Sequence, residues 1–254
     1  MSMRLRLAHL YPDQMNIYGD RGNILALARR CAWRGIELEI MPVGVGADID
    51  WPALDMAFFG GGQDSGQALI AADFVQHQGP ALRTAIDDGL VMLAICGGYQ
   101  LLGHYFLTHT GERLPGIGAI DVHTVGGDVR LIGNIVVDAE LGELAGLAAS
   151  SAHVRLVGFE NHSGRTYLGA GVRPLGRVLA GHGNNGEDGS EGAVYRNTFG
   201  CYMHGSLLPK NPQLADHLIG LALARRYGAS AALAQLDDRL ELAAQRGMVE
   251  RLLH

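Results

Sequence analysis

The stretch VMLAICGGYQLLG, residues 91–103, decides the fold of this chain. The apolar run 91–95 is typical of a buried strand, and a helical segment begins directly after Cys96. A thiol at such a junction lies on a sharp turn at a helix N-terminus, between residues small enough to allow the turn. The helix N-terminus stabilises a thiolate, and the next backbone N–H, that of Gly97, points toward a developing oxyanion. We therefore predict that Cys96 is a nucleophile.

The other two cysteines are interpreted as packing residues, which is the usual role of a free cysteine. Cys31 lies in the middle of a predicted helix. Cys201 lies in a predicted strand whose alternation puts it on the face opposite His204. Neither is expected to take part in chemistry.

Strands and helices alternate through the first half of the chain. We predict strands at 4–10, 38–43, 55–60 and 91–95, and helices at 21–35, 66–78 and 80–88. This alternation indicates parallel pairing with right-handed crossovers, and hence an open α/β sheet flanked by helices. Because ligands bind beyond the carboxyl ends of such strands, the loops after 4–10, 55–60 and 91–95 are the candidate site loops.

The second half changes character. Strand-like segments lie at 133–139, 154–162, 175–181, 191–197 and 198–205, followed by a helix at 211–227. The short turns between these strands predict an antiparallel or mixed extension of the sheet. We expect one domain over 4–228 and a helical extension over 229–254, which either docks on a partner or packs on its own domain.

Composition excludes several classes of protein. The three cysteines lie far apart without a Cys-x-x-Cys pair, which argues against a disulfide scaffold and against a zinc module, so no metal site is expected. A net charge of −6 with scattered basic residues argues against nucleic-acid binding. The N-terminus lacks the apolar core of a signal peptide, and no apolar run is long enough for a membrane span. We expect a cytoplasmic protein.

A cysteine nucleophile needs a base, and two histidines qualify. His204 ends the predicted strand TFGCYMHG, directly before a Gly-Ser turn. His162, in GFENHSG, also ends a strand and lies close in sequence to a carboxylate, Glu160. Spacing alone leaves both histidines open.

Three consecutive glycines, 60–62, follow the strand 55–60. Glycines at a strand end let backbone amides approach a ligand closely, so this loop is a candidate source of a second oxyanion donor opposite Gly97. A phosphate-binding loop is the competing interpretation. The absence of a Gly-Lys-Ser/Thr sequence and the shortness of the loop argue against it.

Together these features resemble class I glutamine amidotransferases of the CobB/CobQ-like branch. The segments 158–164 (GFENHSG) and 200–205 (GCYMHG) are similar to that branch's Gly-x-Glu-x-His-x-Gly and Gly-x-Tyr-x-His-Gly segments. The resemblance spans nearly the whole chain and implies a flavodoxin-like sheet. Within the branch, the segments 7–27, 60–64 and 207–216 resemble the glutaminase subunits of lipid II isoglutaminyl synthases.

The resemblance implies a role for each matching residue. Cys96 matches the nucleophile that attacks the side-chain amide of L-glutamine, and His204 matches the base, which decides between the two histidines. Arg130 matches a position that grips the substrate, and its guanidinium suits the α-carboxylate. The resemblance implies Gly97 and either Gly61 or Gly62 as oxyanion donors. It implies Gln100 as a further residue of the glutamine pocket.

The chain departs from the family pattern after the histidine. Most class I amidotransferases continue as His-x-Glu, whereas this sequence reads His204-Gly205-Ser206. Loss of an orienting carboxylate costs orders of magnitude in rate in the serine-protease triad. Our hypothesis is that the acid comes either from Glu160 or in trans from a partner.

The resemblance also implies a partner, a MurT-type, Mur-ligase-like synthetase that amidates lipid II with the released ammonia. ATP and Mg²⁺ are then expected on the partner, and no cofactor in this chain. Two alternatives remain open at this point. One is an amidotransferase subunit of a cobalamin-type (cobyrinate or cobyric acid) synthetase, and the other is a catalytically silent scaffold subunit.

Overall fold

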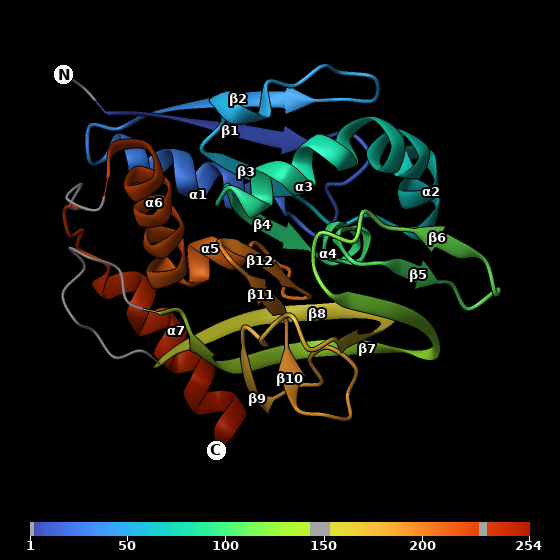
Figure 1. Cartoon of the computed structure of the whole chain (residues 1–254). Coiled ribbons are helices and arrows are strands. Elements are labelled where there is room, and N and C mark those ends of the chain that lie inside the picture. The colour runs from blue at the N-terminus through green and yellow to red at the C-terminus, as the bar shows by residue number, and fades with distance from the viewer. Residues whose placement is uncertain (1–2, 143–152, 229–232) are drawn as a thin grey trace.

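A computed structural model describes residues 3–142, 153–228 and 233–254 of the chain (Figure 1). Its first sheet, sheet A, has the strand order β11-β12-β4-β3-β1-β2. The strands are β1 (Arg4–Leu10), β2 (Glu37–Val43), β3 (Met56–Phe59), β4 (Val91–Ile95), β11 (Ala193–Tyr195) and β12 (Thr198–Cys201). All neighbours pair in parallel except β11, which runs antiparallel to β12. The predicted α/β class with a mostly parallel sheet is confirmed.

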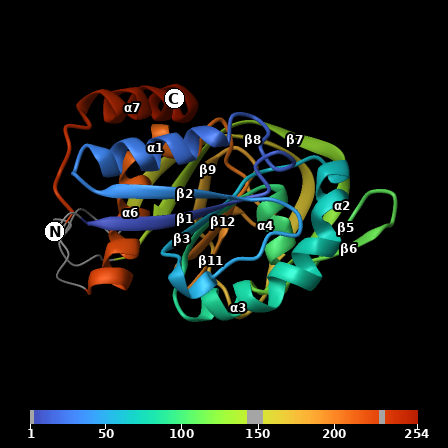
Figure 2. The ribbon, with the colours of Figure 1, turned by 90° about the horizontal axis from the view of Figure 1, so that it is seen from above.

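Helices cover both faces of sheet A, with α1 on one side and α2 and α3 on the other (Figure 2). The first-half helices are α1 (Arg21–Ala32), α2 (Asp64–Asp73), the π-helix η2 (Phe74–Gln78), α3 (Gly79–Asp87) and α4 (Gly97–Leu102), with a 3-10 turn η1 (Trp51–Ala53). Because helices lie on both faces, the central strand β4 is buried along its whole length. This explains its uninterrupted apolar sequence.

The second sheet, sheet B, holds most of the strands from the second half. Its strands are β5 (Tyr105–Leu107), β6 (Arg113–Pro115), β7 (Val122–Glu140), β8 (His153–Leu168), β9 (Gly176–Ala180) and β10 (Ser190–Glu191). The antiparallel strands thus form a sheet of their own instead of widening sheet A, to which only β11 and β12 belong. The β7–β8 pair extends far beyond the predicted 133–139 and 154–162.

The C-terminal part contains α5 (Leu207–Lys210), α6 (Pro212–Tyr227) and α7 (Arg239–Leu253). The predicted helix over 229–254 is wrong for 233–238, which are not helical, while 229–232 lie outside the described residues. Helix α7 packs against β7, β8 and α5 of its own domain.

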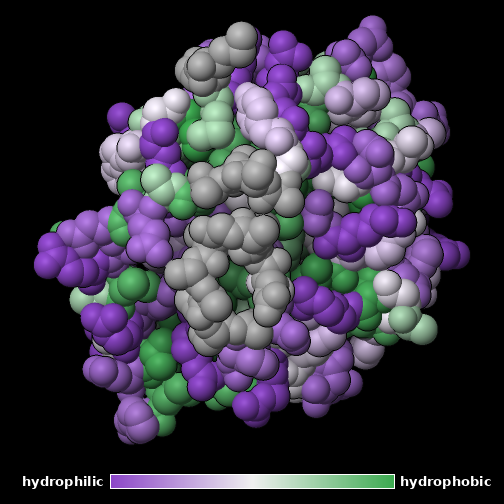
Figure 3. Space-filling view, turned by 60° about the vertical axis from the view of Figure 1, so that its left-hand side comes forward, coloured by the Kyte–Doolittle hydropathy of each residue, from purple (hydrophilic) through white to green (hydrophobic). Residues whose placement is uncertain are grey.

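The face on the left of Figure 1 carries mostly hydrophilic side chains with scattered apolar ones (Figure 3).

Within the described ranges, no helix combines the length and the apolar character needed to cross a membrane.

Candidate active site

Cys96 lies on the turn between β4 and α4. Its backbone has φ 50° and ψ −106°, a conformation that costs energy for any residue other than glycine and that clusters at functional sites. The buried strand and helix on either side hold this turn, and the Cys96 N–H donates to Cys201 O at 2.8 Å. The predicted sharp turn at the strand–helix junction is therefore present, with Cys96 only 6% exposed.

His204 and Asp20 form a buried pair beside this turn. The Nδ1 atom of His204 lies 3.2 Å from Oδ1 of Asp20, and both side chains are fully buried. A two-way backbone bridge to Phe159 in β8 fixes the main chain of His204 directly after β12. Asp20 comes from the loop after β1 and immediately precedes α1. An acid thus orients the imidazole from within the chain.

The electrostatics of His204 depend on its two neighbours. Burial alone would lower the pKa of His204, but the neighbouring Cys96 and Asp20 side chains raise it above the ordinary value. The remaining ring nitrogen, Nε2, is buried and has no hydrogen-bond partner within the described residues. Nε2 is therefore the ring nitrogen left for proton exchange at the Cys96 side of the imidazole.

The glycine loop 60–62 packs between these residues. A Cβ atom on Gly61 would lie 2.6 Å from Cε1 of His204, 3.1 Å from Oδ2 of Asp20 and 3.3 Å from Cβ of Cys96, so only glycine fits. The Gly61 N–H donates to Asp20 Oδ2 at 2.7 Å and is therefore not free to bind an oxyanion. This bond argues against Gly61, and Gly62 stays the predicted donor opposite Gly97.

Glu160, the acid suggested by the sequence, does not contact His204. Its carboxylate accepts the backbone N–H groups of His182 at 2.7 Å and Gly183 at 2.9 Å. Through these bonds Glu160 holds the loop after β9. The Glu160 side chain is fully buried. The hypothesis that Glu160 orients His204 is wrong for this structure, in which Asp20 occupies that place.

A cavity of about 510 Å³ opens onto Cys96. Arg130, Asn161 and Tyr18 line its outer part, and Gln100 lines its inner part. Arg130 is exposed on β7 and bonded to Asn161 of β8, and its role in gripping the substrate stays a prediction.

Gln100 is nearly buried and belongs to a polar chain beneath this cavity. Its Nε2 donates to the hydroxyl of Tyr202, and its Oε1 accepts from Gln67. His162, the rejected alternative base, also lines the cavity and stacks on Tyr202 with ring centroids 3.6 Å apart. His162 thus forms part of the wall, away from the Asp20–His204 pair.

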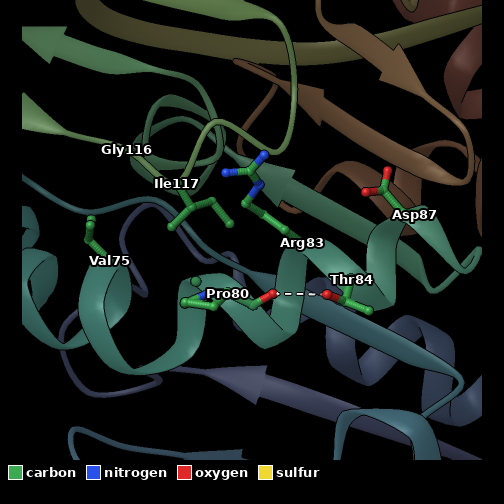
Figure 4. A pocket seen from close by; sticks show the side chains of 8 residues that line it. Val75, Pro80, Arg83, Thr84, Asp87, Gly116 and Ile117 are labelled. Atoms are coloured by element: carbon green, nitrogen blue, oxygen red, sulfur yellow. Dashed lines mark hydrogen bonds between the residues drawn. The ribbon is translucent and has the colours of Figure 1, made fainter.

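A second hollow, of about 530 Å³, lies along α3 (Figure 4). Arg83 and Ile117 line it, and Thr84 donates within the helix to Pro80 O. None of the buried, unpartnered polar atoms found in the described residues lies here. We assign this hollow no ligand. In the same described part of the chain, no group of three or more His, Cys, Asp or Glu side chains is placed to hold a metal ion.

Sequence reasoning missed Asp20, Tyr18, Asn161 and Gln67. One signal was available, because the loop after the first strand was already a candidate site loop. That loop carries two acids, Asp13 and Asp20. Asp20 lies 184 residues before His204, and this separation gives no reason to choose Asp20 over Asp13.

Comparison with known proteins agrees with this geometry. Residues 6–212 match the CobB/CobQ-like glutamine amidotransferase domain. The chain is 38% identical over 247 residues to the lipid II isoglutaminyl synthase (glutamine-hydrolyzing) subunit GatD of Staphylococcus aureus, covering 97% of this chain and 96% of that protein. It is 40% identical to GatD of Streptococcus pneumoniae, covering 93% and 87%.

More distant relatives share part of the chain or only its fold. Cobyric acid synthase of Pelotomaculum thermopropionicum is 38% identical over 59% of this chain and 29% of its own length. Among solved structures, PurLQS of Thermotoga maritima has a TM-score of 0.57 at 17% identity, covering 88% of this chain and 96% of that one. The domain match and the near-full-length relatives place this chain in the CobB/CobQ-like glutamine amidotransferase family.

Proposed function

We propose that this chain is the glutaminase subunit of a lipid II amidating enzyme. It hydrolyses L-glutamine and delivers ammonia to a MurT-type ligase subunit, which converts the α-carboxyl of D-glutamate in lipid II to D-isoglutamine. The observation that carries the proposal is that Cys96 lines one polar cavity while the hydrogen-bonded His204–Asp20 pair lies buried beside it. The names and the coverage of the two GatD relatives support the choice of acceptor.

The first half of the reaction forms a thioester. The Cys96 thiolate adds to the carboxamide carbon of glutamine, and the N–H groups of Gly97 and Gly62 hold the resulting oxyanion. The imidazolium of His204 gives its proton to the amide nitrogen. The carbon–nitrogen bond then breaks, ammonia leaves, and the γ-glutamyl group remains on sulfur.

The second half releases glutamate. A water molecule adds to the thioester carbon while neutral His204 accepts a proton from it. The carbon–sulfur bond breaks, and Cys96 returns as a thiolate beside protonated His204. Asp20, hydrogen-bonded to Nδ1, keeps Nε2 directed at the sulfur throughout.

Free ammonia is protonated and lost at neutral pH, so such a glutaminase is useful only beside its acceptor enzyme. In this proposal ATP, Mg²⁺ and lipid II bind the ligase subunit, this chain carries no cofactor, and both subunits work in the cytoplasm. The acid on His204 is supplied in cis, so the proposal needs the partner for ammonia transfer and not to complete the triad.

Labelling with 6-diazo-5-oxo-L-norleucine, an electrophilic glutamine analogue, tests the chemistry. We expect one adduct on Cys96, which is absent from Cys96→Ser and retained in the control Cys31→Ser, because Cys31 is buried in α1. The absence of an adduct even with the ligase present would leave only a scaffold role.

Co-purification followed by an amidation assay tests the acceptor. We expect a Mur-ligase-like protein to co-purify and the complex to amidate lipid II with glutamine as nitrogen donor. Amidation of a cobyrinate substrate in place of lipid II would instead assign the chain to a cobalamin-type synthetase.

A further inference from the structure

Tyr18 is a strained residue at the mouth of the cavity. It has φ 52°, in the left-handed region, and its side chain is 44% exposed although it lines the site. Its neighbours fix the loop, because Ile17 N–H donates to Gly61 O and Asp20 N–H donates to Ile17 O. A strained residue held in this way next to a reactive group indicates a functional position.

The ring of Tyr18 covers the catalytic histidine. The ring centroids of Tyr18 and His204 are 5.0 Å apart and the planes meet at 71°, an edge-on contact. His204 is fully buried. Tyr18 therefore separates the imidazole from the open part of the cavity.

Asn161 connects Tyr18 to Arg130. Its Oδ1 accepts from Nε of Arg130 and its backbone O accepts from Nη2, both at 2.9 Å. Its Nδ2 donates to the Tyr18 hydroxyl, also at 2.9 Å. A guanidinium only donates, so Oδ1 must face Arg130 and Nδ2 must face Tyr18. The orientation of the Asn161 amide is thus determined by its partners.

Two donors remain for a ligand. The Tyr18 oxygen accepts from Asn161, which leaves its own O–H free to donate. Asn161 accepts from Nε and Nη2 of Arg130, which leaves the Nη1 end of the guanidinium for a ligand. Both residues line the cavity that holds Cys96. One charged and one neutral donor on the same wall suit a carboxylate.

We propose that Tyr18 and Arg130, both oriented by Asn161, bind the α-carboxylate of the substrate glutamine, while the Tyr18 ring shields His204. The inference rests on the proposed function and adds Tyr18 as a substrate-binding residue and Asn161 as a positioning residue. It predicts that the chain selects free glutamine over a substrate without that negative charge.

The test compares L-glutamine with L-glutaminamide, in which a neutral amide replaces the α-carboxylate. Ammonia release, the product common to both substrates, is measured for the wild-type chain with its ligase partner, for Tyr18→Phe and for Asn161→Ala. Tyr195→Phe is the matched control, because it also loses a bonded hydroxyl but lies on β11 against Asp87.

We expect Tyr18→Phe to raise the KM for glutamine about tenfold, the effect of one lost hydrogen bond to a charged group. Its kcat should stay within about twofold, because the phenyl ring still covers His204, and its KM for glutaminamide should rise less than that for glutamine, because a neutral amide oxygen accepts a weaker hydrogen bond. Asn161→Ala should reduce the preference for glutamine over glutaminamide at least as much as Tyr18→Phe does. Tyr195→Phe should retain the wild-type preference.

An unchanged preference in Tyr18→Phe, or an equal loss with both substrates, overturns the assignment. Calorimetric binding of both compounds to Cys96→Ser, with and without Tyr18→Phe, provides a measurement that does not need turnover. Absence of hydrolysis by the wild type therefore counts against the proposed function, whereas lack of discrimination in binding counts against this subsite. Thermal melting of each variant identifies loss of folding.

Discussion

Asp20 stabilises the protonated form of His204. Its carboxylate lies 3.2 Å from Nδ1 in a fully buried setting, where a fixed negative charge stabilises the imidazolium more strongly than it would in water. The same carboxylate holds Gly61 N–H and so joins the glycine loop to the base. One residue thereby orients the imidazole and positions the loop that supplies the oxyanion donor.

Asp20→Asn tests this role. The carboxylate raises the pKa of His204, so its removal lowers that pKa, and the imidazolium that protonates the leaving amide nitrogen is lost at a lower pH. We expect kcat to fall at least about a hundredfold and the alkaline limb of the kcat/KM profile to move to lower pH. Asp13→Asn, an exposed acid in the same loop, is the control. An alkaline limb that does not move contradicts the assignment.

Gly61→Ala tests the close packing of the three groups. The added methyl would lie 2.6 Å from His204 Cε1, so the imidazole or the loop must shift. Misplacement by about 1 Å costs about a hundredfold in rate, which is the loss we expect in glutamine hydrolysis. Gly44→Ala, where the methyl meets no atom within 4 Å, should keep full activity. Wild-type rates in Gly61→Ala would show that the site tolerates the displacement.

At the scale of elements, Asn211 joins the strand that supports His204 to the C-terminal helices. Its side chain accepts from Val157 N–H of β8 and donates to Val157 O and to Leu207 O of α5. Gln245 of α7 also donates to it. Because β8 holds the backbone of His204 through Phe159, Asn211 supports the site from a distance.

Asn211→Ala should therefore destabilise the fold. It leaves several buried backbone groups without partners, at a cost of about 1–3 kcal/mol for each unsatisfied group. We expect a loss of at least about 2 kcal/mol in the free energy of unfolding, measured by urea denaturation. Gln213→Ala, which removes only long contacts with Gln245, should cost less than about 0.5 kcal/mol. Equal losses in both variants would refute the supporting role of Asn211.

At the scale of the whole molecule, a buried charge cluster ties the C-terminal extension to the α/β domain. Arg30 of α1 bonds both carboxylate oxygens of Asp216 in α6 and both of Asp238, which precedes α7. Arg34 bonds Asp216 and the carbonyl of Ala234. The Arg30 side chain is only 5% exposed, so its charge depends on these partners.

Arg30→Met should release the extension. Asp238 then loses its bonds to Arg30 and Asp216 keeps only its bond to Arg34, and breaking a buried pair in this way costs about 3–5 kcal/mol. We expect the Tm to fall by about 10 °C and protease cleavage near 233–238 to accelerate. Arg29→Met, the exposed neighbour in the same helix, is the control. An unchanged Tm would mean that the acids find other partners.

The sequence by itself determined whatever depends on neighbouring residues. The strand, turn and helix around Cys96 follow from an apolar run and two glycines, which act over a few residues, and the class of sheet follows from the alternation of such segments. The same local rules placed His204 at a strand end. They misjudged 233–238, whose conformation depends on Arg30 and Arg34 contacting Asp238 and Ala234.

Only the tertiary structure decided how the site is completed. Asp20 and Tyr18 reach His204 and Asn161 because β1 and β12 end at the same edge of sheet A, and β8 crosses beside them. Glu160 was the candidate acid in the sequence, but backbone N–H groups of the loop after β9 hold its carboxylate. A hydrogen bond depends on distance and direction in space, and sequence separation carries no information about either.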